Sequence, residues 1–530
     1  AGNDVTTGTN NTLIGANAGD KTTTASNNTA MGYASLSANT TGADNTAIGS
    51  LALDANTTAD GNTAVGSSTL GANTTGADNV AMGEAALLSN TTASNNTAIG
   101  VSSLRANTTG SGGTAVGKGA LLSNTTGTDN TSVGSLSLDA NTTGANNAAF
   151  GHGALSENTT ASNNTGVGFY ALLSNTTASN NTAVGANALL VNTTGTRNTA
   201  LGATALDGNT TASDNTAIGY QALGALSTGA ANTVLGSQAL DASTTGTENV
   251  AIGYRALSSD TKGQRNVAIG NETLFSQNIT SATNTYNTAV GFHALYANST
   301  GAGNTSIGGL SLDANTTGVN NVAVGRTSLS ANTTGGNNVA LGYNSAVTLT
   351  TGSNNTTLGY DTRTSANSSA GQIVIGSSVY GTANSRVHIG NSSSHIYNDY
   401  NSNATWTHSS DERSKKDIES STLGLSFIEE LKPVTYKFKA PSDYPTEWQS
   451  YSADKTKPSN ENTQHGMIAQ DVKAALDKFN VEDFKGWDVL PDGKQQISEA
   501  MFVFPLIKAV QELSTQVDEL KQELSALKGE

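Results

Sequence analysis

Small polar and apolar residues recur along most of this chain with a spacing of 17 residues. Three successive units read NTAIGSLALDANTTADG (45–61), NTAVGSSTLGANTTGAD (62–78) and NVAMGEAALLSNTTASN (79–95). A composition rich in Asn, Thr, Ser, Ala and Gly is compatible with disorder or with stacked repeats. The strict period favours stacked repeats, in which each unit is one structural module.

The Asn that opens each unit keeps this spacing from Asn11 to Asn355, with two exceptions. Gly113 replaces it once, and the unit that starts at Asn266 is four residues longer, so the next begins at Asn287. The repeat therefore predicts one continuous stack of coils over about residues 1–360.

Each unit reads as one coil of a β-solenoid. The N-T/V-A-[I/V/M/L]-G block predicts a short strand whose large apolar residue points inward, and the Gly allows a bend that other residues avoid. The A-L pair predicts the start of a second strand, and N-T-T-G is a turn in which Asn adopts the left-handed conformation. Stacking would bury two apolar stripes. These are Ile48, Val65, Met82, Ile99 and their successors, and Leu53, Leu70 and Leu87.

The predicted rod is long and thin. About twenty coils at roughly 4.8 Å per step give a length on the order of 100 Å. One coil holds only about two or three large apolar side chains, too few for a comfortable core in a single chain. We therefore expect several chains side by side, sharing the apolar stripe along a common axis.

The aligned Asn and Thr residues have two functional interpretations and one structural interpretation. A flat Thr array is a candidate for ice binding, and N-x-T is a glycosylation acceptor. Tight turns need the same residues, so we favour a ladder of side-chain hydrogen bonds inside the solenoid.

Composition and charge exclude several function classes. The chain has no Cys, which excludes disulfides and thiolate chemistry, and its formal net charge of -16 disfavours nucleic acid as a partner. We find no signal peptide and no apolar run long enough to insert in a membrane, although the start at Ala1 leaves open a processed segment. We expect no cofactor.

The period decays after Asn355, and residues 361–409 predict a closing segment. GQIVIGSSVYG (371–381) and SRVHIGNSSSHIYNDY (385–400) predict two strands that end the rod. Aromatic residues gather in this segment, and they are candidates either for receptor contact or for capping the apolar end of the solenoid. They are Tyr397, Tyr400 and Trp406.

Three histidines in the same segment raise the question of a metal site. His388, His395 and His408 could meet around a symmetry axis. Their spacing is not of a metal-binding type, so we expect ordinary hydrogen-bonding residues and no metal.

Residues 410–530 have the composition of an ordinary small α/β domain. The pattern predicts a helix that stops before Pro433, a strand, a strand followed by a helix, and a long final helix. The segments are TLGLSFIEEL (422–431), VTYKFK (434–439), HGMIAQDVKAALDKF (465–479) and PLIKAVQELSTQVDELKQELSALK (505–528).

The final helix carries an apolar seam with alternating steps of four and three residues. The seam consists of Leu506, Val510, Leu513, Val517, Leu520, Leu524 and Leu527. Such spacing is typical of a coiled coil, so we expect this helix to associate with copies of itself or to pack along another helix. β-Branched residues alternating with Leu favour dimers in isolation. The needs of the rod together with the family resemblance described below favour trimers, and we give these more weight than three short heptads.

The repeats resemble the head domains of trimeric autotransporter adhesins over roughly residues 8–360. Those heads carry a similar [N/S]-x-A-I-G block in a left-handed β-roll. The coil length and the N-T-T-G turn differ in this chain. The resemblance implies a trimeric β-roll.

The C-terminal blocks SDERSKK, HGMIAQDV and PLIKAVQEL closely resemble the intramolecular chaperone of phage tail fibres and tailspikes, the S74 peptidase family, over about residues 405–530. In that family the domain trimerises, guides folding of the β-rich fibre and then cuts itself off in a single turnover. The resemblance implies Ser410 as nucleophile, Lys415 as its base and scission of the Ser409–Ser410 bond.

The residues themselves are compatible with this chemistry. A serine hydroxyl needs a base, and a lysine can serve when it is uncharged. Lys415 lies within reach of Ser410 if the segment is helical or tightly turned, and we expect hydrogen bonds of Asp411 and Arg413 to hold that turn. The alternative from spacing alone is a helix cap, Ser410-Asp411, followed by ordinary charges.

We weigh three functions. The first is a homotrimeric tail fibre or spike of the virion, made in the host cytoplasm, that binds a glycan or protein on a bacterial surface. The second is a bacterial surface adhesin, which should carry a membrane-anchoring series of alternating strands that residues 440–530 lack. The third is a glycan-degrading spike, which needs paired carboxylates. The acids Asp54, Asp139 and Asp313 lie whole coils apart and are expected to be solvated turn residues.

Overall fold

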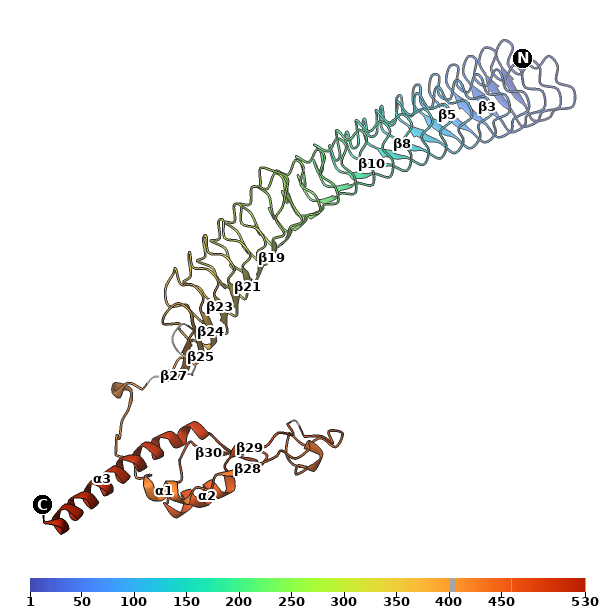
Figure 1. Cartoon of the computed structure of the whole chain (residues 1–530). Coiled ribbons are helices and arrows are strands. Elements are labelled where there is room, and N and C mark those ends of the chain that lie inside the picture. Colours follow the sequence, from blue (N-terminus) through green and yellow to red (C-terminus); the bar gives the residue numbers. More distant parts are fainter. Residues whose placement is uncertain (401–406, 409, 459, 530) are drawn as a thin grey trace. The chain divides into compact units, whose positions relative to one another are not determined.

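The computed structural model describes residues 1–400, 407–408, 410–458 and 460–529. The chain divides into two units, Ala1–Ser409 and Ser410–Glu530. The first is a gently curved β-solenoid and the second is a small α/β unit that ends in a long helix (Figure 1). The predicted fold class, mostly β with an α/β C-terminal region, is confirmed.

The solenoid has one three-residue strand in each coil. Successive strands pair in parallel at the repeat spacing, so that Thr97 lies beside Thr114 and Ile99 beside Val116. These coil strands are β1 Thr12–Ile14, β2 Thr29–Met31, β3 Thr46–Ile48, β4 Thr63–Val65, β5 Val80–Met82, β6 Thr97–Ile99, β7 Thr114–Val116, β8 Thr131–Val133, β9 Ala148–Phe150, β10 Thr165–Val167, β11 Thr182–Val184, β12 Thr199–Leu201, β13 Thr216–Ile218, β14 Thr233–Leu235, β15 Val250–Ile252, β17 Val267–Ile269, β19 Thr288–Val290, β20 Thr305–Ile307, β21 Val322–Val324, β22 Val339–Leu341 and β23 Thr356–Leu358.

The prediction that the large apolar strand residues point inward is wrong. In β6, Ala98 in the middle of the strand is fully buried, whereas Ile99 is 38% exposed. Side chains alternate between the two faces of a strand, so only the middle residue of three can face the interior. The third residues instead form an outer row along the solenoid, the outer apolar row. It begins with Ile14, Met31, Ile48, Val65, Met82 and Ile99.

The second stripe is buried as predicted, but not in a strand. Leu53, Leu70 and Leu87 are fully buried. Each lies in a turn with a left-handed backbone, with φ near +52° for Leu53. A bulky residue with positive φ is costly on its own and persists only where its surroundings fix it. Here the backbone N–H of Leu53 donates to the Thr69 carbonyl of the next coil at 3.0 Å.

The glycine after each strand is fixed by the approach of the next coil. Gly100 has φ +134°, and a Cβ added there would lie 2.5 Å from the carbonyl oxygen of Gly117. Both the dihedral angle and the close backbone therefore exclude a larger residue.

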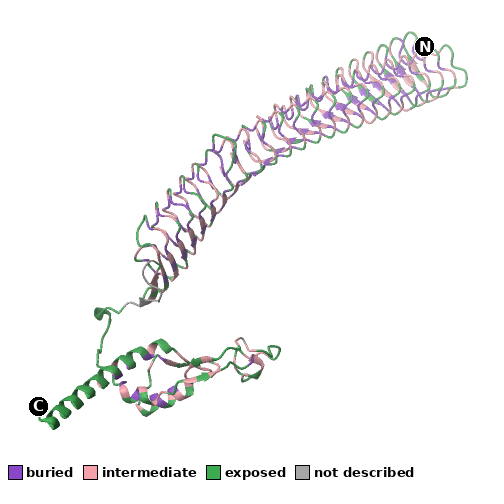
Figure 2. Cartoon of the chain, viewed as in Figure 1, coloured by how far each residue is buried: buried purple, intermediate pink, exposed green. Residues whose placement is uncertain are grey.

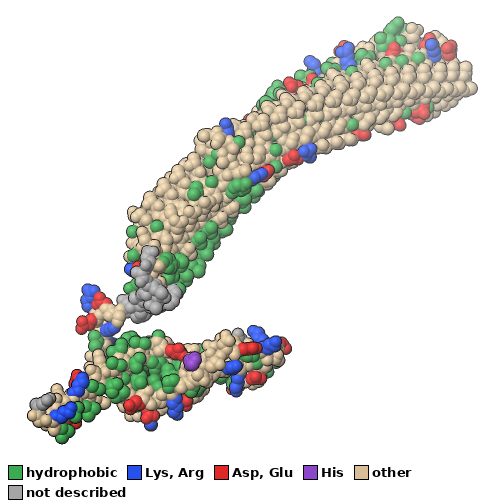
Figure 3. Space-filling model, viewed as in Figure 1, with side chains coloured by type: hydrophobic (Ala, Val, Ile, Leu, Met, Phe, Trp, Pro, Cys, Tyr) green, Lys and Arg blue, Asp and Glu red, His purple; other side chains and the backbone are tan. Residues whose placement is uncertain are grey.

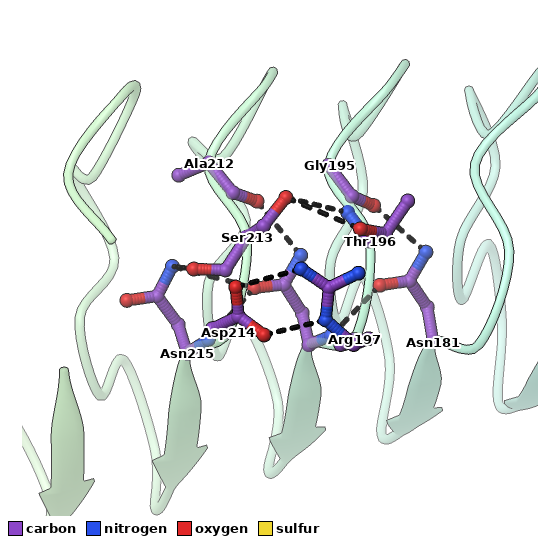
Figure 4. Close-up of polar contacts among 9 residues, drawn as sticks. Asn181, Gly195, Thr196, Arg197, Ala212, Ser213, Asp214 and Asn215 are labelled. Carbon is purple, nitrogen blue, oxygen red and sulfur yellow. Dashed lines mark hydrogen bonds and ion pairs between the residues drawn. The ribbon is translucent and has the colours of Figure 1, made fainter. Parts of the chain in front are cut away.

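Two ladders of asparagine side chains run through the solenoid, as predicted by the structural interpretation of the repeat. In the first ladder, the backbone N–H of Asn198 donates to Oδ1 of Asn181, the equivalent residue of the preceding coil, at 2.9 Å. Its own Nδ2 donates to the Ala212 carbonyl at 2.8 Å. Figure 4 shows these rungs beside the surface ion pair between Arg197 and Asp214, whose closest atoms are 2.6 Å apart.

The second ladder is formed by the Asn of the N-T-T-G turn. Asn90 is fully buried and its Nδ2 donates to Asn73 Oδ1 at 2.8 Å and to the Ala93 carbonyl at 3.0 Å. This Asn does not have positive φ, contrary to prediction. After this turn, positive φ occurs instead at the residue before the next leading Asn, such as Asn95.

The longer coil is anchored by a residue set of its own. The short strands β16 (Gly263–Gln264) and β18 (Thr283–Asn284) pair there. In the preceding coil, the buried Asp260 occupies the position of the turn Asn; its carboxylate accepts from the backbone N–H of Ile279 in the longer coil at 3.0 Å and from Gln277 Nε2 at 2.8 Å. The turn Asn is missing from Leu226 to Gln277, so the ladder is interrupted over four successive coils.

The closing segment has more strands than the two predicted. It contains β24 (Ile373–Ser377), β25 (Arg386–Asn391), β26 (His395–Asp399) and β27 (Thr407–His408). β25 and β26 form an antiparallel hairpin within the stretch predicted as one strand. The reason is a tight turn, in which Asn391 Oδ1 accepts from the backbone N–H groups of Ser393 and Ser394, each at 2.9 Å.

The second unit follows the predicted order of helices and strands. Its elements are the short turn η1 (Glu412–Ser414), α1 (Leu425–Glu430), β28 (Val434–Tyr436), η2 (Pro441–Asp443), β29 (Gln464–Gly466), α2 (Ala469–Lys478), β30 (Trp487–Val489), β31 (Gln495–Ile497), η3 (Glu499–Phe502) and α3 (Val503–Lys528). A small core surrounds the buried Phe427, whose ring meets those of Phe479 and Phe502.

Both units leave long apolar surfaces exposed. Hydrophobic side chains gather along the edge of the solenoid that carries β19 to β25 (Figure 3). In the second unit, α3 is exposed over most of its length (Figure 2), including every residue of its predicted seam, with Leu527 84% exposed. Within the described residues, none of the helices has the length and apolarity needed to span a membrane.

The buried ladder makes a testable prediction about stability. Asn90→Ala should lower the free energy of unfolding by about 1–3 kcal/mol, because it removes the acceptor of Asn107 Nδ2 and the donor to Asn73 Oδ1 inside the coil stack. Denaturant unfolding of the full chain measures this. The exposed Thr92 in the same turn provides the control, and Thr92→Ala should change the free energy little. Equal effects of the two variants would contradict the structural role of the ladder.

Candidate active site

The segment that opens the second unit is organised by an aspartate. Asp411 has an extended backbone and precedes the single turn η1, and its Oδ1 accepts from the backbone N–H of Arg413 at 2.9 Å. This is the usual behaviour of an N-cap residue. The hydroxyl of Ser414 donates to the Asp411 carbonyl at 2.7 Å and closes the turn from the other side.

The turn brings together the two residues expected to form the dyad. Lys415 Nζ lies 2.6 Å from Ser410 Oγ, although five positions separate them in sequence. The reversal depends on η1, after which Lys415 returns to an extended backbone and donates its N–H to the Glu412 carbonyl. A tight turn, one of the two geometries anticipated from the spacing, therefore creates the contact.

Asp411 and Arg413 form an ion pair within this turn. The guanidinium donates from Nε and Nη2 to the two carboxylate oxygens at 3.0 and 2.7 Å. These hydrogen bonds keep the pKa of Asp411 below its usual value. The carboxylate therefore stays charged and continues to organise the segment across the neutral pH range.

The dyad lies on an open surface in the single chain. Residues 410–417 are all exposed. A charged lysine donates to the serine oxygen, whereas an uncharged lysine accepts the hydroxyl proton along the same 2.6 Å line. The arrangement has the geometry for nucleophile activation, but water surrounds it.

The aromatic candidates of the closing segment differ in their surroundings. Tyr400 is 51% exposed. Tyr397 is packed, with its ring 5.5 Å from that of His388 and the Arg386 guanidinium 5.3 Å from its centre. Trp406, and likewise Ser409 of the expected scissile bond, lie outside the described residues. Tyr400 is therefore the candidate that the structure places at the surface.

The histidines of this segment are not assembled into a metal site in the part of the chain that the structure describes. His388 is fully buried, accepts from the backbone N–H of Thr382 at 3.3 Å, and lies 5.4 Å from His395 between ring centres. Burial lowers the pKa of His388 to about 4, and the neighbouring His395 and Arg386 act in the same direction. The side chain of His408 lies outside the described residues.

The acids of the repeat are half-buried rather than fully solvated. Burial raises the pKa of both Asp54 and Asp313. Asp139 accepts a hydrogen bond from Ser156 Oγ at 2.6 Å. Each lies at the same position of its coil, where the turn packs against the neighbouring coils.

A group of exposed aromatic residues on the shaft was missed by the sequence reasoning. Several coils carry an aromatic side chain directly after the strand glycine, among them Tyr220, Tyr254 and Phe292, and these are exposed. The signal was present in the sequence, because the 17-residue alignment of coils places them at one coil position. The sequence reasoning looked for exposed aromatics only near the closing segment.

The comparisons with known proteins bear on the second unit. Residues 410–480 match the family Peptidase_S74, described as the chaperone of endosialidase. The matched region begins at Ser410 and includes η1, both residues of the Ser410–Lys415 pair and α2. No curated protein and no solved structure matches the chain.

The buried histidine predicts an acid-sensitive rod end. A His whose pKa falls on folding stabilises the folded state above its unfolded pKa of about 6.5, and this contribution is lost as the pH falls from 6.5 to about 4. Thermal midpoints at pH 7 and pH 4.5 should therefore differ less in His388→Gln than in the wild type. The exposed His465 offers the matched control, and His465→Gln should keep the wild-type difference. An unchanged pH difference in His388→Gln would overturn this role.

Proposed function

We propose that this chain, a tail fibre or tailspike type protein with a self-cleaving chaperone-of-endosialidase domain at its C-terminus, assembles as a homotrimer under the direction of that domain. The domain then cuts the Ser409–Ser410 bond. The observation that carries the proposal is the 2.6 Å contact between Ser410 Oγ and Lys415 Nζ, at the start of the region that matches the family.

The proposed cleavage is a single-turnover acyl transfer. Ser410 Oγ attacks the carbonyl carbon of Ser409 while the uncharged Lys415 amine takes the hydroxyl proton. The C–N bond breaks as that proton passes to the nitrogen of Ser410, which leaves an ester between the two residues. Water hydrolyses the ester and separates the solenoid from residues 410–530.

The exposure of the dyad favours assembly before cleavage. A lysine acts as a base only when uncharged, and a dry site favours its uncharged form. In the single chain, Ser410 and Lys415 are exposed to water. We propose that packing of neighbouring subunits covers the dyad and so couples cleavage to completed assembly.

Two unpartnered apolar surfaces support assembly. The outer apolar row repeats once per coil along the solenoid, and the seam of α3 repeats along a 26-residue helix. Exposed apolar surface of this extent usually marks an interaction site. A seam of alternating β-branched residues and Leu also suits a dimer, and the trimer is inferred from the family rather than from the seam.

The repeat explains the use of a chaperone domain. Coils that slip by one unit present almost the same row to a neighbouring chain, so many misaligned assemblies compete with the correct one. A self-associating C-terminal domain fixes the number and alignment of chains before the coils zip together. Removal of that domain leaves a rod that is kinetically trapped, because refolding has lost its guide.

We propose that the mature rod is part of the virion and binds a bacterial surface, with Tyr397, Tyr400 and Trp406 as receptor candidates in the closing segment. The alternative, a bacterial surface adhesin, shares the rod. The Peptidase_S74 match at residues 410–480 favours the tail fibre, because a chaperone that removes itself belongs to the maturation of such fibres.

Cleavage provides the direct test. Wild-type protein on denaturing electrophoresis should yield a band shortened by residues 410–530, whereas Ser410→Ala and Lys415→Arg should remain full-length, because the first lacks the nucleophile and the second lacks a residue able to lose its proton.

The neighbouring lysine supplies a matched control. Lys416 is exposed and pairs with Asp417 at 3.9 Å, away from Ser410, so Lys416→Arg should still be cleaved. Full-length wild-type protein, or cleavage of Ser410→Ala at the same bond, would contradict the proposal.

A further inference from the structure

Three neighbouring coils of the solenoid carry side chains that the rest of the repeat does not need. They are the coils that open at Asn249, Asn266 and Asn287, and they include the longer coil. Stacking in register lines up equivalent positions, so side chains from the three coils form columns along the solenoid. One column is charged and one is aromatic.

The charged column consists of Arg255, Glu272 and His293. Arg255 Nη1 lies 3.6 Å from Glu272 Oε1, and His293 Nε2 lies 2.9 Å from Glu272 Oε2. The Glu272 side chain is 21% exposed, so its carboxylate is held in place between two partners and still reaches solvent.

The aromatic column lies beside the charged column. The rings of Phe275 and Tyr296 stack with centres 5.2 Å apart and planes 9° from parallel. The Arg255 guanidinium lies 4.4 Å from the centre of Phe275, and the His293 ring lies 4.6 Å from that of Tyr296. The two columns therefore form one connected platform. Phe292, 54% exposed, extends it by stacking on His293 at 3.8 Å.

The fold does not explain these aromatic residues. Coils elsewhere hold Ser37, Asp54, Gly71 or Leu88 at the position of Phe275 and Tyr296. Because small and polar residues serve equally well there, the rings are not required for stacking of the coils. Departures from a structural rule without structural need are expected at functional sites.

The aromatic column ends at the next coil, where Asp313 occupies the position of Tyr296. The Oδ1 atom of Asp313 is enclosed within the coil stack, so it is not within reach of a ligand on the surface.

We infer that this platform is a binding site for a pyranose-containing polysaccharide of the bacterial surface. The apolar C–H face of a sugar ring stacks on aromatic rings, whose faces carry partial negative charge. The hydroxyl groups at the edge of the sugar donate to the fixed carboxylate of Glu272 and accept from Arg255. The columns run from coil to coil, which suits an extended chain of sugars.

The inference rests on the proposed function, since it specifies where and what kind of bacterial surface molecule the rod binds. It places the contact on the shaft, separate from the receptor candidates in the closing segment. Cleavage and glycan binding are measured independently, so one can fail without the other.

The test uses the full chain and an array of bacterial lipopolysaccharides and capsular polysaccharides, followed by calorimetry with the polysaccharide that binds most strongly. The double variant Phe275→Ser with Tyr296→Ser introduces serine, which another coil already carries at this position as Ser37. It should bind at least tenfold more weakly, and Glu272→Gln should also weaken binding severalfold.

Leu122→Ser is the matched control, because Leu122 occupies the same position of a coil outside the platform and is similarly half-buried. It should bind as the wild type does. Wild-type binding that survives the double variant would overturn the site while leaving host recognition intact. No binding of wild type to any polysaccharide, or loss of assembly in the double variant as measured by light scattering, would also overturn the inference.

Discussion

The constraint on which the structure depends is that every coil must present the same backbone to the coil before it and the coil after it. Strands pair in register at each step, and the glycine after the strand lets neighbouring backbones approach to distances that exclude a Cβ. Asparagine side chains then form hydrogen bonds with buried backbone groups that the short three-residue strands leave without partners.

This constraint lets one chain fill its own interior with little more than alanine and leucine. Consequently, the large residue at the end of each strand has no place inside and remains on the outer face, as Ile99 shows. The apolar surface available for contact with other chains is therefore on the outside of the solenoid. A surface that repeats once per coil specifies contact but neither alignment nor the number of chains. In the proposed function, the chaperone domain, with its own exposed seam on α3, supplies this alignment and the number of chains.

The sequence was sufficient for features fixed by spacing. The period predicted the stack, the turn Asn ladder and the burial of Leu53, and the apolar pattern predicted α3. The sequence was not sufficient where the same spacing is compatible with two different structures. A strand of three residues does not reveal which face is inside, so Ile48 was placed on the wrong side. Leu53 was expected in a strand because local preference opposes positive φ, which only the neighbouring coils stabilise.

The candidate site also combines a feature that the sequence spacing predicts with a feature that only the folded chain reveals. The separation of five positions from Ser410 to Lys415 allowed a contact, and the hydrogen bonds of Asp411 explain why the chain makes it. The platform around Glu272 escaped notice because its members are far apart in sequence and meet only when coils are aligned across the longer one.

The mass of the intact protein in solution tests the central claim most directly, namely that a self-filled solenoid still needs sister chains to cover its outer row. Light scattering on uncleaved Ser410→Ala protein should give three times the single-chain mass of 53.5 kDa. A mass equal to one chain would contradict the account.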